Sequence, residues 1–448
     1  MGLSGNNSSD TGGAAPLWQL LRSSTHVLQA VRRGQSATEV LAAIPSHLRA
    51  GSLALSSHAL RHGGAAQVLR DRLVQHAPPP AIDALLCTAL ALMADPQTMP
   101  YPDHTLVSQT VECAKREPRW RKQAGFINAC LRSFLREREA LLASIQAQPL
   151  AQWNHPAWWI QTLQRDWPQH WQKLLRYNSL QAPMTLRINR RRASVAQVQA
   201  QLQAADIPCT PVGTSGLQLH NARPVDRIPG FAEGLWSVQD AAAQLAAPLL
   251  LGDRSITGRR VLDACAAPGG KTAHLLELED CSMLALDVSA ARCERIHTTL
   301  GRLGLQAEVR CADALAPDTW WDGRPFDAIL LDAPCSGSGV VRHHPDIPWL
   351  RREADINRLA STQAALLKTL WPLLAPSGRL LYCTCSVFRD EGERTIQAFL
   401  AHNTGARLLP SPGALLPLDV TNGGDLPDNS LGAHDGFFYA LLEKMARA

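Results

Sequence analysis

The 448-residue chain lacks any run of eighteen or more apolar residues, so no membrane-spanning helix is expected. Its first ten residues contain neither a basic nor an apolar segment, so no secretory signal peptide is expected. Asn6 stands where N-myristoylation needs Ser or Thr, so N-myristoylation is not expected either. We expect no membrane partner, and we expect residues 1–15 to form a disordered tail.

Cysteine frameworks are also missing. The 11 cysteines have no framework spacing, and the only close pair is Cys383 and Cys385. An odd number of dispersed thiols in a long chain is typical of a reducing compartment. We therefore expect free thiols, a cytoplasmic location and no metal site.

The charge of the chain is unevenly distributed. The net charge is +5 over residues 1–150, +6 over 151–230 and −6 over 231–448. A length of 448 residues predicts two to three domains. A basic half joined to an acidic half suggests a polyanionic substrate that one part holds and another modifies. The alternative is an ordinary solvated surface.

Residues 16–146 are predicted to form an all-helical domain. Apolar residues recur there at helical spacing, which predicts a bundle of about six helices. After a first helix from Leu17, the expected helices cover about 52–75, 81–94, 104–115 and 121–146. The bundle should carry a basic face made of Lys115, Arg116, Arg119, Arg121, Lys122, Arg132, Arg136 and Arg138.

The rest of the chain predicts two further folds. Residues 147–230 are expected to form a helical linker and a small basic α+β insert, with a strand at 184–189 and a helix near 194–205. From 231 to 448, strands alternate with helices, which predicts a doubly wound, mostly parallel sheet. The expected strands are 260–264, 282–287, 306–310, 326–331, 379–384 and 436–442. The expected helices are near 239–250, 270–278, 289–303, 352–374 and 390–402.

A glycine-rich turn at 265–271 joins the first of these strands to a helix. Glycine lets the backbone approach a ligand closely, and a helix N-terminus offers free N–H groups. The turn matches neither a P-loop nor G-x-G-x-x-G, so a phosphate cradle is disfavoured. Asp287 ends the second strand, where a carboxylate could accept ribose hydroxyls, and Asp313 follows the third. Each aspartate alone is more often a cap, but the strand-end aspartates together predict an adenosine-type ligand.

Two cysteines follow two other apolar strands. Cys335 closes the run from Phe326, and Cys385 closes the run from Arg379. In an open α/β sheet, ligands bind outside the carboxyl ends of the strands, so both thiols could face one pocket. This arrangement favours covalent chemistry over packing. The alternative, a small buried apolar residue, is what we expect for most of the other cysteines.

Several of these motifs resemble one enzyme family. Asp263–Lys271, Asp332–Ser336 and Thr384–Ser386 resemble the cofactor loop and the two cysteine motifs of the Sun/Fmu (RsmB-type) RNA 5-methylcytosine methyltransferases. Residues 234–244, 345–350 and 435–440 also fit, and 126–132 is similar to the NusB-like helical domain of the RsmB branch. The resemblance covers nearly the whole chain. It implies a Rossmann-like catalytic domain at 231–448, S-adenosylmethionine as cofactor and small-subunit ribosomal RNA as substrate.

The chemistry of this family explains why it uses two thiols. Cytosine C5 is a poor nucleophile until a thiolate adds to C6, and a base must later remove the C5 proton. The residues alone leave open which cysteine attacks. The resemblance implies that Cys385 is the nucleophile and Cys335 assists release, that Asp332 holds the cytosine edge and contacts the cofactor, and that Lys271 orients the base or a neighbouring carboxylate. It implies a cofactor site made of Cys265, Ala266, Ala267, Pro268, Gly269, Gly270, Lys271, Asp287, Asp313 and Asp332.

Two other functions stay open at this point. One is methylation of a transfer RNA cytosine by the same chemistry. The other is a non-catalytic, NusB-like RNA-binding factor whose catalytic domain has lost its activity. DNA is disfavoured as substrate, because DNA cytosine enzymes place the nucleophile in the Pro-Cys motif, here Pro334-Cys335. No obligatory protein partner is expected.

Overall fold

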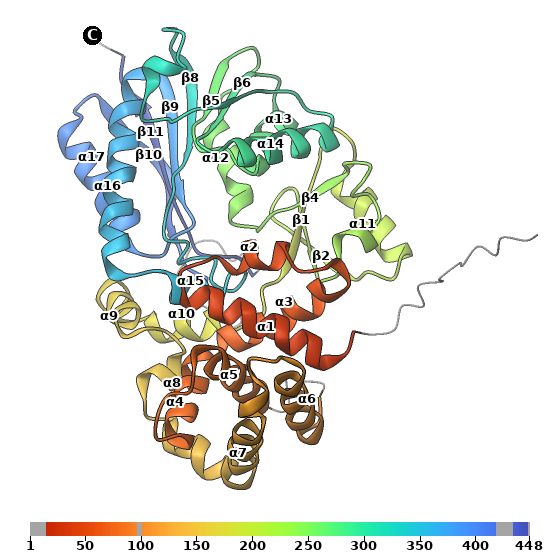
Figure 1. Cartoon of the computed structure of the whole chain (residues 1–448). Coiled ribbons are helices and arrows are strands. Elements are labelled where there is room, and N and C mark those ends of the chain that lie inside the picture. The colour runs from red at the N-terminus through yellow and green to blue at the C-terminus, as the bar shows by residue number, and fades with distance from the viewer. Residues whose placement is uncertain (1–14, 96–100, 418–432, 447–448) are drawn as a thin grey trace, which may run out of the picture. The chain divides into compact units, whose positions relative to one another are not determined.

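The computed structural model describes residues 15–95, 101–417 and 433–446 (Figure 1). The chain divides into two compact units, residues 1–157 with 344–350 and residues 158–343 with 351–448. The disordered tail expected at 1–15 lies outside the described residues except for Ala15. None of the described helices is long and apolar enough to cross a membrane.

The first unit is a bundle of helices. Its most buried member is α5 (Pro80–Ala94), in which every residue from Ile82 to Met93 is buried. The others up to Ala157 are α1 (Leu17–Arg32), α2 (Ala37–Ala42), α3 (Ser46–Arg61), α4 (Gly63–Leu73), α6 (Asp103–Arg116), α7 (Ala124–Ile145) and α8 (Pro149–Trp153). Over the described residues of the range 16–146, the expected number of about six compares with seven α-helices, α1 to α7.

The stretch expected to be helical over about 52–75 is helical, but it is divided. The structure has two helices there, because α3 ends at Arg61 and α4 begins at Gly63. A Cβ atom on Gly64 would lie 2.1 Å from the backbone oxygen of Leu150. The glycines therefore allow α4 to pack closely against α8, and the chain turns where they occur.

A segment remote in sequence completes this unit. Asp346 accepts a hydrogen bond of 2.9 Å from the backbone N–H of Ala37, at the start of α2. In the short helix α15 (Ile347–Leu350), Trp349 donates through Nε1 to the backbone oxygen of Leu60, also at 2.9 Å. The motif at 345–350 thus belongs by its contacts to the helical unit.

The second unit contains a small antiparallel sheet. Its strands, in the order β2-β3-β1-β4, are β2 (Cys209–Val212), β3 (Gly216–Leu219), β1 (Met184–Ile188) and β4 (Trp236–Val238). The helix α11 (Val195–Ala204) packs on it through Val198 and Leu202. A Ser194–Gln197 capping box begins α11. The helices α9 (Ala157–Asp166) and α10 (Trp171–Asn178) precede this sheet.

The large sheet of the second unit has the order β10-β11-β9-β8-β5-β6-β7. The strands β5 (Arg260–Asp263), β6 (Ser282–Asp287), β7 (Glu308–Cys311), β8 (Phe326–Asp332) and β9 (Leu374–Thr384) are parallel, and β11 (Phe437–Lys444) and β10 (Ala406–Leu415) complete an antiparallel edge. The predicted doubly wound sheet is confirmed. The edge strand β10 was missed, because Pro410, Pro412 and Gly413 interrupt its sequence.

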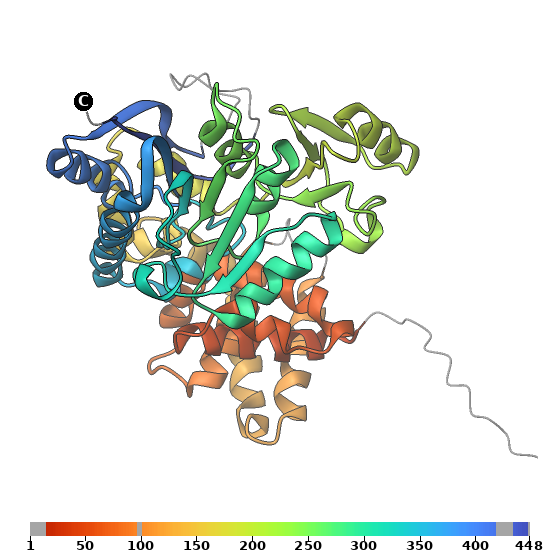
Figure 2. The same cartoon turned by 90° about the horizontal axis from the view of Figure 1, so that it is seen from above.

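Helices cover both faces of this sheet (Figures 1 and 2). α12 (Ala246–Leu251), α13 (Gly270–Leu278) and α14 (Ala290–Leu303) bury one core with residues such as Leu330 and Leu381. α16 (Glu353–Leu370) and α17 (Glu393–His402) bury the other with Ile329 and Leu380. Neighbouring residues of β8 and β9 thus point into opposite cores, as the pleat of a strand requires.

Candidate active site

The two cysteines Cys335 and Cys385 come together at the carboxyl ends of β8 and β9. These strands are parallel neighbours, and Asp332 is paired with Cys383 in their register. The backbone N–H of Gly339 donates to the oxygen of Cys385 at 3.0 Å, which holds the two loops side by side. The two Sγ atoms are 3.4 Å apart. The structure therefore brings together the two thiols that the sequence placed fifty residues apart.

The surroundings of Cys335 favour the neutral, protonated form of its thiol. The pKa of the Cys335 thiol is raised well above its ordinary value by the hydrogen bond to Cys385, by burial, and by the nearby charges of Cys385 and Glu391. Cys335 therefore holds its proton and can donate it toward Cys385.

Lys271 and Asp332 form an ion pair next to these cysteines. Lys271 Nζ lies 2.6 Å from Asp332 Oδ2, and the two side chains are 12% and 29% exposed. Burial lowers the pKa of Lys271, but Asp332 together with Cys383 and Cys385 raises it by more, so the net pKa is raised and the ammonium stays charged. Cys383 Sγ lies 3.5 Å from the other oxygen of Asp332. A fixed cation at this place favours a thiolate nearby.

The glycine-rich turn leads from β5 into α13. Gly269 has φ +94° and lies directly before the first residue of α13, a conformation that favours glycine. The Thr272 hydroxyl donates to Asp263 Oδ2 at 2.6 Å and thereby fixes the helix start to the strand end. Burial raises the pKa of Asp263 to about 7, against the effect of the Thr272 hydrogen bond. Cys265 lies in the same turn, and burial together with three aspartates raises its pKa.

The other predicted cofactor residues follow the neighbouring strands. Asp287 is buried at the end of β6, where it accepts from the Ser289 N–H and lies 3.3 Å from Arg292. Asp313 is exposed after β7 and accepts from the Leu315 N–H. Carboxylates therefore end or follow four parallel strands of one sheet edge, around a turn that begins a helix. This set of hydrogen-bond acceptors fits S-adenosylmethionine, whose ribose hydroxyls and amino groups are donors.

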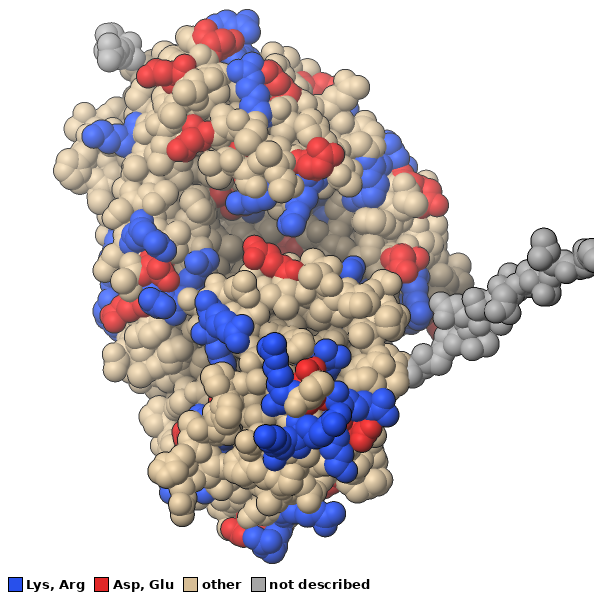
Figure 3. All heavy atoms as spheres, in the orientation of Figure 1, with Lys and Arg blue, Asp and Glu red and all other residues tan. Residues whose placement is uncertain are grey.

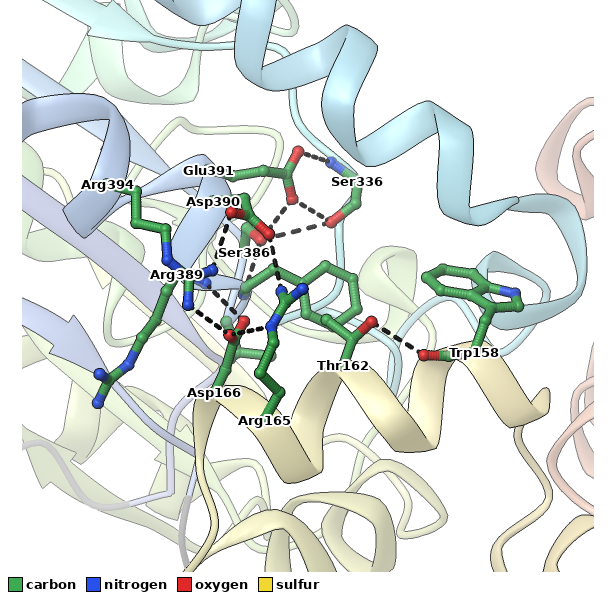
Figure 4. Close-up of polar contacts among 12 residues, drawn as sticks. Trp158, Thr162, Arg165, Asp166, Ser336, Ser386, Arg389, Asp390, Glu391 and Arg394 are labelled. Atoms are coloured by element: carbon green, nitrogen blue, oxygen red, sulfur yellow. Dashed lines mark hydrogen bonds and ion pairs between the residues drawn. The ribbon is translucent and has the colours of Figure 1, made fainter. Parts of the chain in front are cut away.

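A serine–glutamate network next to the cysteines was missed from the sequence (Figure 4). Ser336 and Ser386 each follow one cysteine, and both hydroxyls contact the carboxylate of Glu391, at 2.5 and 2.6 Å. Glu391 is completely buried. The sequence could have indicated the two serines, because a serine follows each cysteine. It could not indicate that Glu391 is buried, because its neighbours in the sequence are charged.

A buried ion pair that holds the cofactor turn was also missed. Arg187 of β1 makes two hydrogen bonds to Glu277 of α13, at 2.9 and 2.7 Å, and both side chains are at most 1% exposed. The same guanidinium donates to the backbone oxygen of Gly270 at 2.7 Å. The small sheet thus contacts the start of α13 directly.

A cluster of three titratable side chains could in principle hold a metal ion. It consists of Asp240, His343 and Asp435, whose potential ligand atoms all lie within 4.8 Å of one another. Asp240 accepts from the Asp435 N–H at 3.1 Å, while Arg342 and His343 contact the Asp435 carboxylate at 3.2 and 3.1 Å. Burial and the Asp435 charge raise the pKa of Asp240 to about 7. These hydrogen bonds and ion pairs join the motif at 234–244 to the motif at 435–440. They can hold the two segments together without a bound ion.

Comparison with known proteins identifies the family. The model for 16S rRNA methyltransferase RsmB/F matches residues 254–443, and that for the RsmF/B-like ferredoxin-like domain matches 155–226. Ribosomal RNA small subunit methyltransferase B of Pseudomonas putida is 45% identical over 77% of this chain and 79% of that protein. The enzyme of the same name from Vibrio cholerae is 42% identical over 77% and 78%. The chain belongs to the RsmB/F family of methyltransferases.

A solved structure extends this comparison to the fold. The crystal structure of PH0851 has a TM-score of 0.72 and 25% identity, and the match covers 95% of this chain and 99% of that one. The predicted family, the fold class of helical bundle, small α+β insert and Rossmann-like domain, and the use of S-adenosylmethionine by an RNA methyltransferase are confirmed. The individual roles of the site residues belong to the proposal below.

Proposed function

We propose that this RsmB/F protein methylates C5 of a cytosine in small-subunit ribosomal RNA through a covalent bond between Cys385 and C6. The observation that carries the proposal is the 3.4 Å contact of two thiols at the ends of β8 and β9, beside the Lys271–Asp332 pair. The names of the curated relatives supply the substrate class. Since ribosomal RNA is the substrate, we place the protein in the cytoplasm.

The proposed reaction begins with attack by the Cys385 thiolate on C6, which makes C5 nucleophilic. S-adenosylmethionine, when bound at the 265–271 turn, supplies the methyl group. Asp332, held by its ion pair with Lys271, would accept a hydrogen bond from the exocyclic amino group of the cytosine. The target base must be unstacked to reach these residues.

Release of the product needs a base for the C5 proton, and Cys335 would supply it. The largest cause of the raised Cys335 pKa is the hydrogen bond to Cys385, with the Cys385 charge as a further cause. Both are weakened or removed once Cys385 is an uncharged thioether, while burial and Glu391 still raise the pKa of Cys335. Cys335 can then pass its proton to solvent and, as a thiolate, take the proton from C5; the C5–H electrons reform the ring double bond, and the C6–S electrons return to Cys385 as it leaves.

The helical unit and the small sheet are proposed to bind the RNA, with domain boundaries at 16–146, 147–230 and 231–448. Lys and Arg side chains gather on the helical unit around α1 and α6 (Figure 3). Lys115, Arg119 and Lys122 are exposed there. In the basic run at 190–192, Arg191 forms an ion pair with Asp280 at 2.7 Å, so its charge is already partly neutralised. The basic face of the helical unit is therefore the better candidate for binding RNA phosphates.

The direct test is transfer of labelled methyl groups to purified small-subunit ribosomal RNA, followed by nucleoside analysis. We expect 5-methylcytosine in the wild-type reaction and none with Cys385→Ala, while both proteins bind S-adenosylmethionine equally. Transfer to transfer RNA alone would show the first rival function. Cofactor binding without transfer to any RNA would show a non-catalytic binding factor.

A further inference from the structure

Glu391 is a buried carboxylate that contacts both cysteine loops at once. It lies in the short 3-10 helix Arg389–Glu391, after β9, with none of its surface exposed. One oxygen accepts from the Ser336 backbone N–H at 2.7 Å, and the other contacts the Ser336 and Ser386 hydroxyls at 2.5 and 2.6 Å (Figure 4). Gln363 adds a fourth contact at 3.3 Å.

The two serines are the residues that directly follow the two cysteines. Because adjacent Cα atoms are only ~3.8 Å apart, hydrogen bonds that hold Ser336 and Ser386 also restrain the positions of Cys335 and Cys385. A single oxygen of Glu391 joins the two hydroxyls, and Ser338 extends the network with a 2.8 Å contact to the Ser386 hydroxyl. The carboxylate thus bridges two loops that come from different strands.

Glu391 itself is held from both sides. The Tyr382 hydroxyl donates to its backbone oxygen at 2.7 Å, and the Thr384 hydroxyl does so at 3.3 Å. On either side of Glu391, Asp166 of α9 accepts from the Arg389 N–H and from the Arg394 guanidinium, both at 3.1 Å (Figure 4). A carboxylate without exposure is costly unless its oxygens are hydrogen-bonded, and here three of the four donors come from the cysteine loops and one from Gln363 of α16.

We propose that Glu391 is a positioning residue that sets the separation and orientation of the Cys335 and Cys385 thiols. It positions the thiols through Ser336 and Ser386, and its charge also raises the pKa of Cys335. This inference rests on the proposed roles of the two cysteines. The length of the side chain is the essential property, because the carboxylate must reach both serines from one place.

Three variants test this in the full-length protein. Glu391→Asp keeps the charge but shortens the side chain, Glu391→Gln keeps the length, and Glu391→Ala removes the bridge. We expect single-turnover methyl transfer at saturating RNA and S-adenosylmethionine to fall about 100-fold in Glu391→Asp and Glu391→Ala, since a displacement of about 1 Å can cost that much. Glu391→Gln should stay within about 10-fold of wild type, because its amide can still contact both hydroxyls.

The matched control is Glu393→Ala, two residues along the chain, whose side chain pairs only weakly with Arg389 at 3.5 Å. Its rate should be unchanged. S-adenosylmethionine affinity, measured by calorimetry, should be unchanged in all variants, which separates positioning from loss of fold. A double-mutant cycle of Ser386→Ala with Glu391→Ala should be strongly non-additive, because both changes remove the same bridge.

The proposal is overturned if Glu391→Asp transfers methyl groups as fast as wild type, or if Ser386→Ala and Glu391→Ala act additively. If Glu391→Ala does not fold, the comparison of Glu391→Asp with Glu391→Gln decides alone. Failure of the cysteine roles would show differently, as activity retained in Cys385→Ala with the Glu391 residue intact.

Discussion

The buried carboxyl group of Asp263 makes the stability of the folded protein depend on pH. It ends β5 with no exposed surface and accepts from Thr272 at the start of α13. Its pKa is raised to about 7 by burial, above the model-compound value of 3.8. Between these pH values the folded protein binds a proton that the unfolded chain has lost. Folding stability from this group is therefore full below about pH 4 and is lost as the pH rises through 7.

Asp263→Asn should remove this dependence. Between pH 4 and 7 the free energy of unfolding of the wild type should fall, relative to the variant, by up to about 1.4 kcal/mol per pH unit. Urea unfolding of both proteins at pH 5, 6 and 7, without cofactor, measures it. A difference that stays constant over this range would show that Asp263 is charged in the folded protein.

The sequence predicts that Cys335 and Cys385 lie in the site, but it does not predict that Glu391 does. Cys335 and Cys385 each end an apolar strand of a parallel sheet, and the carboxyl ends of such strands meet at one edge. Nothing local distinguishes Glu391 from Asp390 or Glu393, because its burial depends on the loops from two other parts of the chain. The same holds for Arg187, whose partner lies ninety residues away.

At the scale of elements, the contact between β1 and α13 joins the small sheet to the cofactor turn. Arg187→Met would leave Glu277 buried without its cation. Loss of one partner of a buried pair typically costs about 3–5 kcal/mol, so we expect a loss of this size in urea unfolding. S-adenosylmethionine affinity should also fall, because Arg187 holds the oxygen of Gly270.

The matched control is the double variant Arg187→Met with Glu277→Met. Replacing both charges by apolar side chains of similar volume should recover most of the stability, since neither charge is then left unpaired. Cofactor affinity should stay low, because the contact to Gly270 is still missing. Equal stability of the single and double variants would argue that Glu277 finds another partner.

Prediction of elements succeeded where the sequence pattern was regular. The strands β5, β6 and β8 and the helices α13 and α14 lie within about two residues of their expected positions, because alternating strands and helices follow from apolar runs and glycine turns. The break at His62 and the strand β10 were missed. Both depend on packing against remote elements, α8 for the first and β11 for the second.

At the scale of the whole molecule, the basic face of the helical unit should govern affinity for RNA without affecting chemistry. Replacing Lys115, Arg119 and Lys122 by Ala should weaken RNA binding and reduce the slope of log affinity against log salt by up to about 2–3, at roughly 0.7–0.9 per phosphate contact. Single-turnover methyl transfer at saturating RNA should be unchanged. An unchanged salt slope would place the RNA elsewhere.

The central claim is the division of work between the two cysteines, and one measurement tests it most directly. Each single variant is incubated with small-subunit ribosomal RNA and S-adenosylmethionine and resolved on a denaturing gel. Cys335→Ala should accumulate a covalent protein–RNA adduct that peptide mapping locates at Cys385, because attack proceeds and release fails. Cys385→Ala should form none. An adduct in Cys385→Ala and none in Cys335→Ala would reverse the two roles and contradict the account.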